Sequence, residues 1–324
     1  MEAPLISVVM SVYNEPLDWL RQSIDSILQQ TYSSFEFIII CDNPNYIEGI
    51  KVLNEYCRKD NRIRLIFNVE NLGLTKSLNI GLRAVKGKYI ARMDADDISL
   101  PERFEEQMQY MESHPECVVC GTRIKYIGEV KWWRRTQSDW IKIENDDIKG
   151  RLIIGSCFAH PTVMIRRMQP QIMYDEDFPR SQDYDMWVRM SKKGSFHNLP
   201  KVLLYYRVSS SQISSRSHNS YAPEIRYHLL LNMFNKGKID VGKTREDMTP
   251  ELLYAKIDQI KSNDVFTNSE CINILQLIYS VQNTHRKKKF LHSLLSGDFF
   301  CFTFLDMMRY IMVTFGIREP IKLI

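Results

Sequence analysis

The chain has 324 residues, of which 44% are apolar and 25% are charged, and its formal net charge is +4. This is an ordinary globular composition, with enough length for one large domain or two smaller ones. The mild charge does not indicate a nucleic-acid partner, and no run of aromatics interleaved with arginines supports one.

The cysteines are odd in number, at positions 41, 57, 117, 120, 157, 271 and 301. Most of them sit in apolar runs, which indicates reduced thiols and a cytoplasmic location. Cys117 and Cys120 have a zinc-like spacing, but no second ligand pair follows, so CVVCGTRIKYI is interpreted as a buried strand. No signal peptide is predicted, and the apolar stretch 299–317 is interrupted by Asp306 and Arg309.

The first half of the chain alternates strand and helix patterns. Continuous apolar runs predict buried strands at 5–12, 35–41, 62–67 and 88–93. Between them, apolar residues at helical spacing predict amphipathic helices, the first with Leu20, Ile24 and Ile27 on one face. Strands that alternate with helices favour an α/β fold with a mostly parallel sheet covered on both sides.

Three carboxylates, Asp94, Asp96 and Asp97, follow the fourth predicted strand. Ser99 and Glu102 then have capping-box spacing, which predicts a helix start just after the aspartates. The aspartates therefore lie at the carboxyl end of a strand, the edge at which open α/β sheets bind ligands. Taken alone, such an acidic turn is more often a solvated loop than a site.

The second half is less regular. A compact stretch from about 150 to 208 contains a predicted helix in SQDYDMWVRMSKKG and a predicted strand in KVLLYYRV. A Ser-rich linker follows at 209–220, and 221–324 reads as mostly helical.

Two nucleotide-binding signatures are missing. The first strand is followed by SVYNEPLDW, which lacks the glycines of a dinucleotide-binding turn, and no P-loop sequence exists. A nucleotide diphosphate could still bind through Mg²⁺ or Mn²⁺, since these ions prefer hard oxygen ligands such as the carboxylates of the acidic turn.

Five segments occur in one order along the chain: SVVMSVYNE, QQTYSSFEFIIICDN, NLGLTKSLNIGL, GKYIARMDADDISLPERFEEQ and QDYDMWVRM. Together they resemble the inverting family 2 glycosyltransferases, which have the GT-A fold. The resemblance covers about 1–210 and implies a GT-A domain there, with a nucleotide-binding half at 1–127 and an acceptor-binding half at 128–210. Residues 211–324 would form a linker and a helical C-terminal region.

The resemblance also implies residue roles on the donor side. Ser11, Tyr13 and Glu15 would contact the nucleotide. Asp42 would reach the base, although Cys41 replaces the first aspartate of the family's usual pair and NPNY replaces the usual Gly-Ser-Thr. Lys76 would approach the nucleotide. Asp94 would bind ribose or sugar hydroxyls and Asp96 would coordinate Mn²⁺ or Mg²⁺, while Asp97 would support the turn.

The family places its catalytic base in an acidic pair ahead of an aromatic helix, and the match here is Gln182-Asp183. Asp183 would therefore take the proton of the acceptor hydroxyl. Gln182, Asp185, Trp187 and His160 are candidates for the acceptor side. Ser209 stands where the family often has a histidine, so no histidine metal ligand is expected at that point.

Two further segments have open interpretations. KWWRRTQSDWIK at 131–142 could clamp an acceptor or form an ordinary loop. The basic cluster and aromatic stretch within 285–317 suit peripheral contact with the inner face of the cell membrane, or packing on the catalytic domain or a second subunit.

The function expected is metal-dependent, inverting transfer of a sugar from a nucleotide-diphosphate donor, a UDP-sugar above others, to a hydroxyl of a growing cell-surface glycan or lipid-linked saccharide. Two alternatives remain. A sugar nucleotidyltransferase needs a Gly-rich basic loop that SVYNEPLDW lacks. A non-catalytic glycan-binding or nucleotide-sugar-binding member of the fold is left open by Gln182 and by CDNPNY.

Overall fold

The computed structural model describes residues 5–130, 140–209, 221–242, 248 and 250–281. The chain divides into two compact units, one of Met1–Ile148 with Ser156–Ala222 and one of Lys149–Gly155 with Pro223–Ile324. Every helix in the described part is too short or too polar to span a bilayer.

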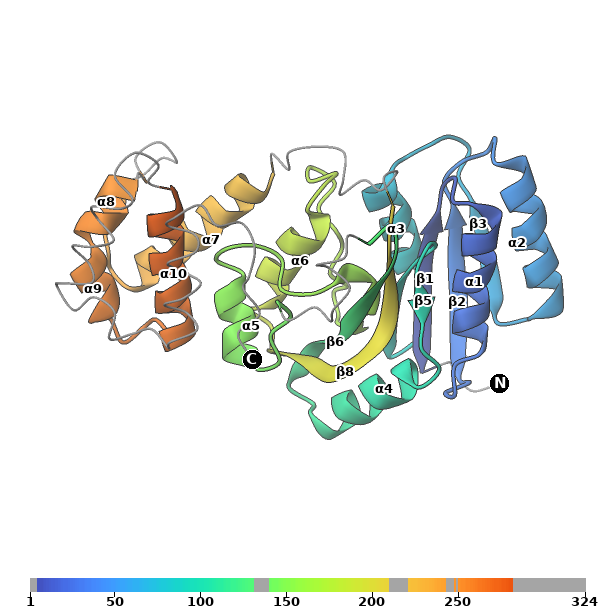
Figure 1. Ribbon diagram of the computed structural model, residues 1–324, viewed down its shortest axis with the longest axis horizontal. Helices are drawn as coiled ribbons and strands as arrows, with labels where there is room; N and C mark the ends of the chain where they lie inside the picture. The colour runs from blue at the N-terminus through green and yellow to red at the C-terminus, as the bar shows by residue number, and fades with distance from the viewer. Residues whose placement is uncertain (1–4, 131–139, 210–220, 243–247, 249, 282–324) are drawn as a thin grey trace. The chain divides into compact units, whose positions relative to one another are not determined.

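A β-sheet organises the first unit (Figure 1). It has eight strands in the order β3-β2-β1-β4-β7-β6-β8-β5. Its strands are β1 Ile6–Val12, β2 Phe35–Cys41, β3 Ile63–Phe67, β4 Tyr89–Asp94, β5 Ile98–Ser99, β6 Cys117–Gly128, β7 Met164–Arg166 and β8 Ser195–Val208. The four strands from β3 to β4 are parallel, as the sequence predicts. Strand β7 pairs antiparallel with both β4 and β6, while β8 pairs parallel with β6 and antiparallel with β5, so the whole sheet is mixed.

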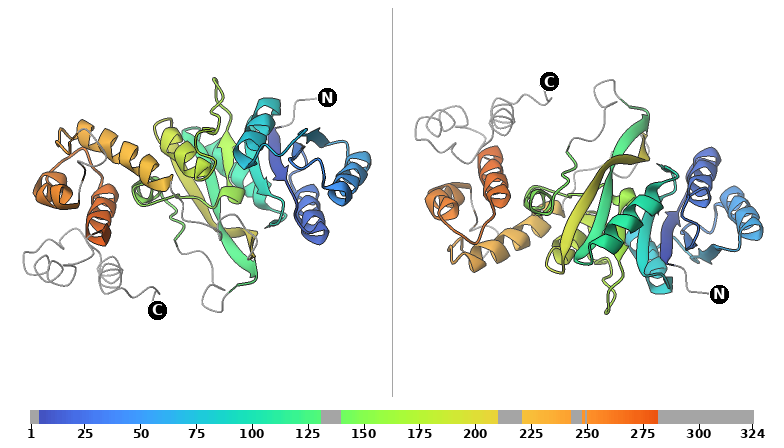
Figure 2. Two further views of the ribbon diagram at one scale, coloured as in Figure 1. Left: turned by 90° about the horizontal axis from the view of Figure 1, so that it is seen from above. Right: turned by 90° about the horizontal axis from the view of Figure 1, so that it is seen from below.

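Helices cover both faces of this sheet: α1 Leu17–Leu28, α2 Ile47–Lys59, α3 Leu74–Ala84, α4 Arg103–Ser113 and α6 Gln182–Met190. Helix α5 Asn145–Arg151 includes residues of both units. Helices α1 and α2 lie on one face and α3 on the other, as right-handed crossovers between parallel strands require (Figure 2). Leu20, Ile24 and Ile27 of α1 are buried, which confirms the predicted apolar face. The α/β class is therefore confirmed.

The predicted capping box before α4 is wrong. Ser99 lies in β5, where its backbone pairs with Leu204 of β8, and its hydroxyl accepts a hydrogen bond from Gln30 Nε2 at 3.1 Å. The residue that precedes α4 is Glu102, which makes no side-chain cap. Ser99 therefore pairs with a strand that is distant in sequence, instead of capping the helix as the local pattern predicted.

The described helices of the second unit are α7 Ala222–Lys236, α8 Pro250–Ala255, α9 Ile257–Lys261 and α10 Asn268–Val281, in agreement with the predicted helical region. Phe234 and Phe266 pack edge to face there, with ring centroids 6.0 Å apart. Asn263 Nδ2 donates to the carbonyl of Gly237 at 2.8 Å. The proposed membrane-contact segment 285–317 and most of 131–142 lie outside the described residues.

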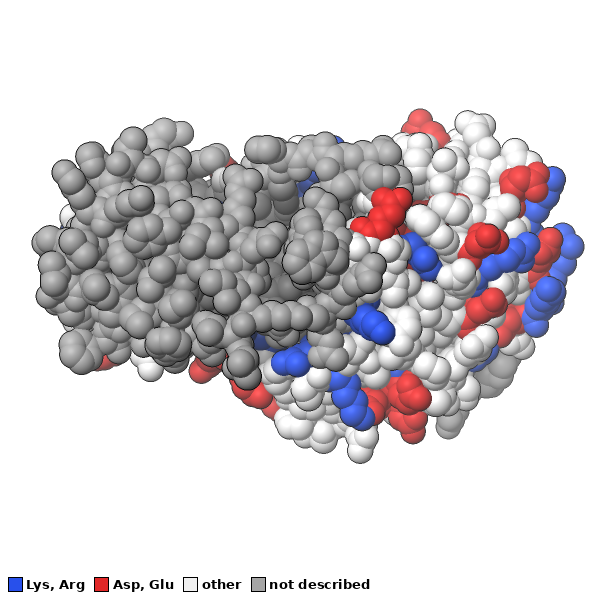
Figure 3. Space-filling model, viewed as in Figure 1, with Lys and Arg blue, Asp and Glu red and all other residues white. Residues whose placement is uncertain are grey.

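Charged side chains of both signs are interspersed over the described part of the face seen in Figure 3. The described part of that face therefore presents mixed charge, with no broad field of one sign.

Candidate active site

The acidic turn lies where the sequence predicts it, at the carboxyl end of the central strand β4. Carboxylate oxygens of Asp94, Asp96 and Asp97 lie within 4.8 Å of one another. Strand β1 runs beside β4 in parallel register, with Ser11 opposite Asp94. The turn after β1 and the acidic turn therefore meet at one edge of the sheet, because parallel strands end together.

Asp97 is the most deeply buried of the three aspartates, with 1% of its surface exposed. Its Oδ1 accepts the backbone N–H of Arg207 at 2.7 Å, whereas its Oδ2 is buried without a hydrogen-bond partner among the described residues. Burial, together with the charges of Asp94 and Asp96, raises the pKa of Asp97 well above its usual range. A buried carboxylate oxygen with no donor, beside two more carboxylates, fits Mg²⁺ or Mn²⁺, which take hard oxygen ligands.

A buried arginine stands behind the turn. Arg92 on β4 is 3% exposed and forms an ion pair with Asp94. Its backbone carbonyl accepts a hydrogen bond from the second buried arginine, Arg103, at 2.9 Å. The ion pair engages one oxygen of Asp94 and so partly neutralises the negative charge of the acidic turn.

The turn after β1 brings Glu15 toward the same aspartates. Its Oε2 accepts the backbone N–H of Tyr13 at 2.9 Å, and the Tyr13 ring is 48% exposed. Burial raises the pKa of Glu15 to about 7, with smaller contributions from the charges of Asp96 and Asp94. Ser11 is half-buried beside Asp94. The structure thus brings Ser11 and Glu15, two of the predicted donor residues, to the acidic turn.

Asp42 is engaged within the protein. Its Oδ1 accepts hydrogen bonds from Asn68 Nδ2 at 2.7 Å and from the backbone N–H of Leu72 at 2.9 Å. Its Oδ2 accepts the backbone N–H of Gly73 at 2.8 Å. These bonds hold the loop that leads into α3, on which Lys76 is exposed. The predicted contact of Asp42 with the base stays a prediction.

Asp183 lies in the first turn of α6, and a hydrogen bond holds its carboxylate. Its Oδ2 accepts a hydrogen bond from Ser156 Oγ at 3.0 Å. Burial raises the pKa of Asp183, while the Ser156 bond and the backbone N–H of Tyr184 act in the opposite direction. Sequence reasoning missed Ser156, because a lone serine in an irregular stretch carries no signal of its distant partner.

The acceptor-side candidates on α6 are mostly enclosed. Asp185 forms an ion pair with Arg189 at 2.6 Å, one helical turn away. Trp187 is fully buried and packs edge to face on Phe158, with centroids 5.3 Å apart. Gln182 is buried at the helix start. These contacts indicate that Asp185 and Trp187 hold α6 in place.

The surroundings of His160 favour the neutral form of its imidazole ring. Burial and the charge of Arg92 lower its pKa well below 6.5. Its Nε2 lies 2.7 Å from the hydroxyl of Tyr174, and its ring also contacts Trp187. The histidine is therefore placed by two aromatic neighbours, and its acceptor role stays a prediction.

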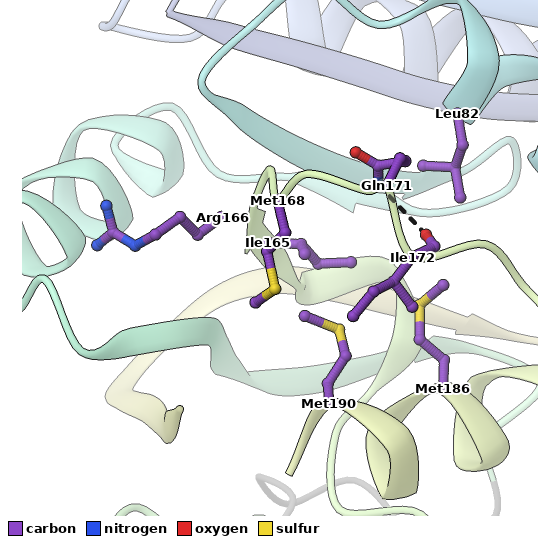
Figure 4. A pocket seen from close by; sticks show the side chains of 8 residues that line it. All are labelled: Leu82, Ile165, Arg166, Met168, Gln171, Ile172, Met186 and Met190. Carbon is purple, nitrogen blue, oxygen red and sulfur yellow. Dashed lines mark hydrogen bonds between the residues drawn. The ribbon is translucent and has the colours of Figure 1, made fainter. Parts of the chain in front are cut away.

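A methionine-rich apolar pocket lies away from the aspartates (Figure 4). Its lining comes from α3, β7, α6 and the segment between the last two, and consists of Leu82, Ile165, Arg166, Met168, Gln171, Ile172, Met186 and Met190. Ile165 pairs with Ile90 near the start of β4, whereas Asp94 ends that strand. The pocket offers no carboxylate and takes no part in the arrangement described above.

Solved structures share this fold. S. aureus TarS, residues 1–349, in complex with UDP-GlcNAc has a TM-score of 0.57 at 16% identity, over 97% of this chain and 91% of that one. The mannosyltransferase PcManGT from Pyrobaculum calidifontis, in complex with GDP-Man and Mn²⁺, has a TM-score of 0.50 at 15% identity, over 97% and 87%. These likenesses confirm the GT-A type of fold.

Sequence relatives define the class. The chain is 38% identical over 214 residues to an uncharacterized glycosyltransferase of Methanocaldococcus jannaschii, covering 64% of this chain and 72% of the relative. It is 37% identical over 213 residues to the O-antigen biosynthesis glycosyltransferase WbnJ of Escherichia coli, covering 63% and 80%. The protein is a glycosyltransferase. Residues 7–170 match the family described as Glycosyl transferase family 2, and the chain belongs to that family.

Proposed function

We propose that the protein transfers a sugar from a UDP-sugar to a hydroxyl of a growing cell-surface glycan or lipid-linked saccharide, with inversion and with a divalent metal. The observation that carries this proposal is the cluster of three carboxylates within 4.8 Å, one of which has a buried oxygen with no donor in the described part of the chain. A cation relieves such crowding, and Mg²⁺ is typically held by one or two carboxylates plus substrate phosphates.

On the donor side, Asp96 would hold Mn²⁺ or Mg²⁺ and Asp94 would bind ribose or sugar hydroxyls. When bound, the ion supplies positive charge that stabilises the departing diphosphate. Ser11, Tyr13 and Glu15 line the adjacent turn and would contact the nucleotide. Lys76 and Asp42 would complete the donor contacts, Asp42 largely through the loop it holds.

Asp183 is the proposed base. The acceptor oxygen forms its bond to the anomeric carbon while the bond to the diphosphate oxygen breaks, and the hydroxyl proton passes to the Asp183 carboxylate. Ser156 donates to Asp183 Oδ2 and so fixes which oxygen faces the acceptor. Gln182 and neutral His160 would contact the acceptor, while Asp185 and Trp187 position α6.

Related proteins guide the choice of substrates. TarS and PcManGT are described with UDP-GlcNAc and with GDP-Man and Mn²⁺, and relatives are named for O-antigen and amylovoran biosynthesis. All six described cysteines are free thiols, which fits a reducing compartment, and we place the reaction on the cytoplasmic side.

The test is a screen of nucleotide sugars by thermal shift with Mn²⁺, followed by transfer assays with the ligands that bind. A ligand present far above its dissociation constant raises the melting temperature. A UDP-sugar that stabilises only with Mn²⁺, and is hydrolysed or transferred, supports the proposal. Preference for GDP-sugars would contradict the proposed UDP-sugar donor. Binding of nucleotide sugars without hydrolysis or transfer would contradict the proposed transfer reaction.

A further inference from the structure

We propose that Arg207 is a positioning residue for the cation-binding turn, an inference that rests on the proposed function. Arg207 is buried near the end of β8. Its backbone N–H donates to Asp97 Oδ1 at 2.7 Å, and its side-chain Nε donates to the backbone carbonyl of Asp96 at 2.7 Å. One residue thus holds two consecutive positions of the acidic turn.

The far end of the same side chain is anchored on α1. Arg207 Nη2 donates to Gln22 Oε1 at 2.8 Å, and the guanidinium lies 4.8 Å from the ring centroid of Trp19. Helix α1 also holds the start of the turn, since Ser23 Oγ donates to the backbone carbonyl of Asp94 at 2.7 Å. The turn is therefore held by α1 at Asp94 and by Arg207 at Asp96 and Asp97.

This arrangement suits a residue that orients metal ligands without contacting the metal. Fixing the carbonyl of Asp96 fixes the backbone from which its carboxylate projects, and the Asp97 carboxyl is fixed through Oδ1. Groups that orient metal ligands in this way set metal affinity, and their removal typically costs about 10- to 100-fold. The planar guanidinium reaches the carbonyl and Gln22 together, which a lysine ammonium at this position cannot do.

The test measures Mn²⁺ binding to the full chain with saturating UDP, from the loss of the free-ion electron paramagnetic resonance signal beyond the loss that the same UDP causes without protein. We expect Arg207→Lys, which keeps the charge and the backbone N–H, to weaken Mn²⁺ binding by about 10-fold or more. Gln22→Met, at an exposed position, should weaken it by about 3-fold. The double variant should bind no more weakly than Arg207→Lys alone, because the two changes remove one connected contact.

Arg166→Lys is the matched control. Arg166 donates to the backbone carbonyls of Met111 at 2.5 Å and Cys117 at 3.0 Å. It pairs with Tyr89 at the start of β4, whereas the acidic turn lies at the end of that strand. Its replacement should lower the melting temperature in EDTA and leave Mn²⁺ affinity unchanged. Melting of every variant in EDTA separates folding from binding, and Gln22→Met carries the test if Arg207→Lys does not fold.

The outcomes are distinct. If the wild type binds Mn²⁺ and the folded variants Arg207→Lys and Gln22→Met bind it equally tightly, the positioning role of Arg207 is overturned while the proposed function stands. Equal weakening by Arg166→Lys also overturns it, because the effect would then follow from lost stability. Absence of Mn²⁺ binding by the wild type with any nucleotide diphosphate overturns the metal-dependent function and this role with it.

Discussion

Ser156 Oγ donates a hydrogen bond to Asp183 Oδ2 at 3.0 Å, across 27 positions of sequence. The bond fixes the orientation of a carboxylate whose pKa is raised by burial. A general base needs both properties, because it must face the proton that it takes, and a raised pKa makes its ionised form a stronger base.

The first prediction concerns the base itself. Asp183→Asn keeps an oxygen that can accept from Ser156 but cannot take a proton, so kcat should fall by about 10²- to 10⁴-fold. Binding of UDP in the presence of Mn²⁺ should be unchanged by calorimetry. Asp185→Asn is the control: it breaks the ion pair with Arg189 and should lower the melting temperature with little effect on kcat. Wild-type turnover in Asp183→Asn would remove this residue as the base.

The second prediction concerns pH. Because burial raises the pKa of Asp183 above its usual value of 3.8, activity should fall as the pH drops through that raised pKa and the base becomes protonated. The Ser156 bond favours the ionised form. Ser156→Ala should therefore move the acidic limb of the profile of kcat/KM to higher pH. Ser191→Ala, which removes a hydroxyl from the end of the same helix, should leave the limb in place; an unmoved limb in Ser156→Ala would contradict the assignment.

The third prediction concerns the metal. Removal of a group that only orients a metal ligand typically weakens metal binding by about 10- to 100-fold. Asp96→Ala removes a proposed ligand itself and should weaken Mn²⁺-dependent binding of UDP by more than that. Titration calorimetry of UDP with Mn²⁺ and with EDTA measures this. Asp60→Asn, which breaks an ion pair with Arg62, provides a carboxylate control of equal charge change. Unchanged affinity in Asp96→Ala would count against the metal site.

The fourth prediction concerns stability. Burial raises the pKa of Glu15 from 4.5 to about 7. The contribution of the protonated Glu15 carboxyl to folding stability is therefore complete below pH 4.5 and is lost as the pH rises through 7. Glu15→Gln should therefore gain stability over wild type across that window, by on the order of 1–3 kcal/mol at pH 8. Thermal melts in EDTA at pH 4.5 and pH 8 measure the difference. Glu70→Gln, at an exposed site, should show no such trend, and a pH-independent difference for Glu15→Gln would contradict the prediction.

Much of the fold could be predicted because its first half follows local rules. Strands β1 and β2 are continuous apolar runs buried on both faces, and parallel strands bring the ends of β1 and β4 to one edge. That reasoning placed the acidic turn at the ligand-binding edge of the sheet without any knowledge of contacts, whereas Glu15 was named only through the family resemblance.

What could not be predicted depends on contacts between distant residues. Ser99 matches a helix cap locally but pairs with Leu204 in a strand. Ser156 and Arg207 have no sequence pattern around them, and their relevance comes only from the side chains they meet. Trp187 is a related case, because an aromatic residue on a helix has the same spacing whether it faces a sugar or the core.

Asp97 Oδ2, buried with no hydrogen-bond partner among the described residues, links the proposed metal site to pH. A carboxyl whose pKa lies well above its usual range holds a proton under conditions in which a free aspartate has lost it. A divalent ion bound among these carboxylates would displace that proton, so metal uptake and proton release would be one exchange reaction. Metal affinity should therefore rise with pH, and the apparent binding enthalpy should change with the ionisation enthalpy of the buffer.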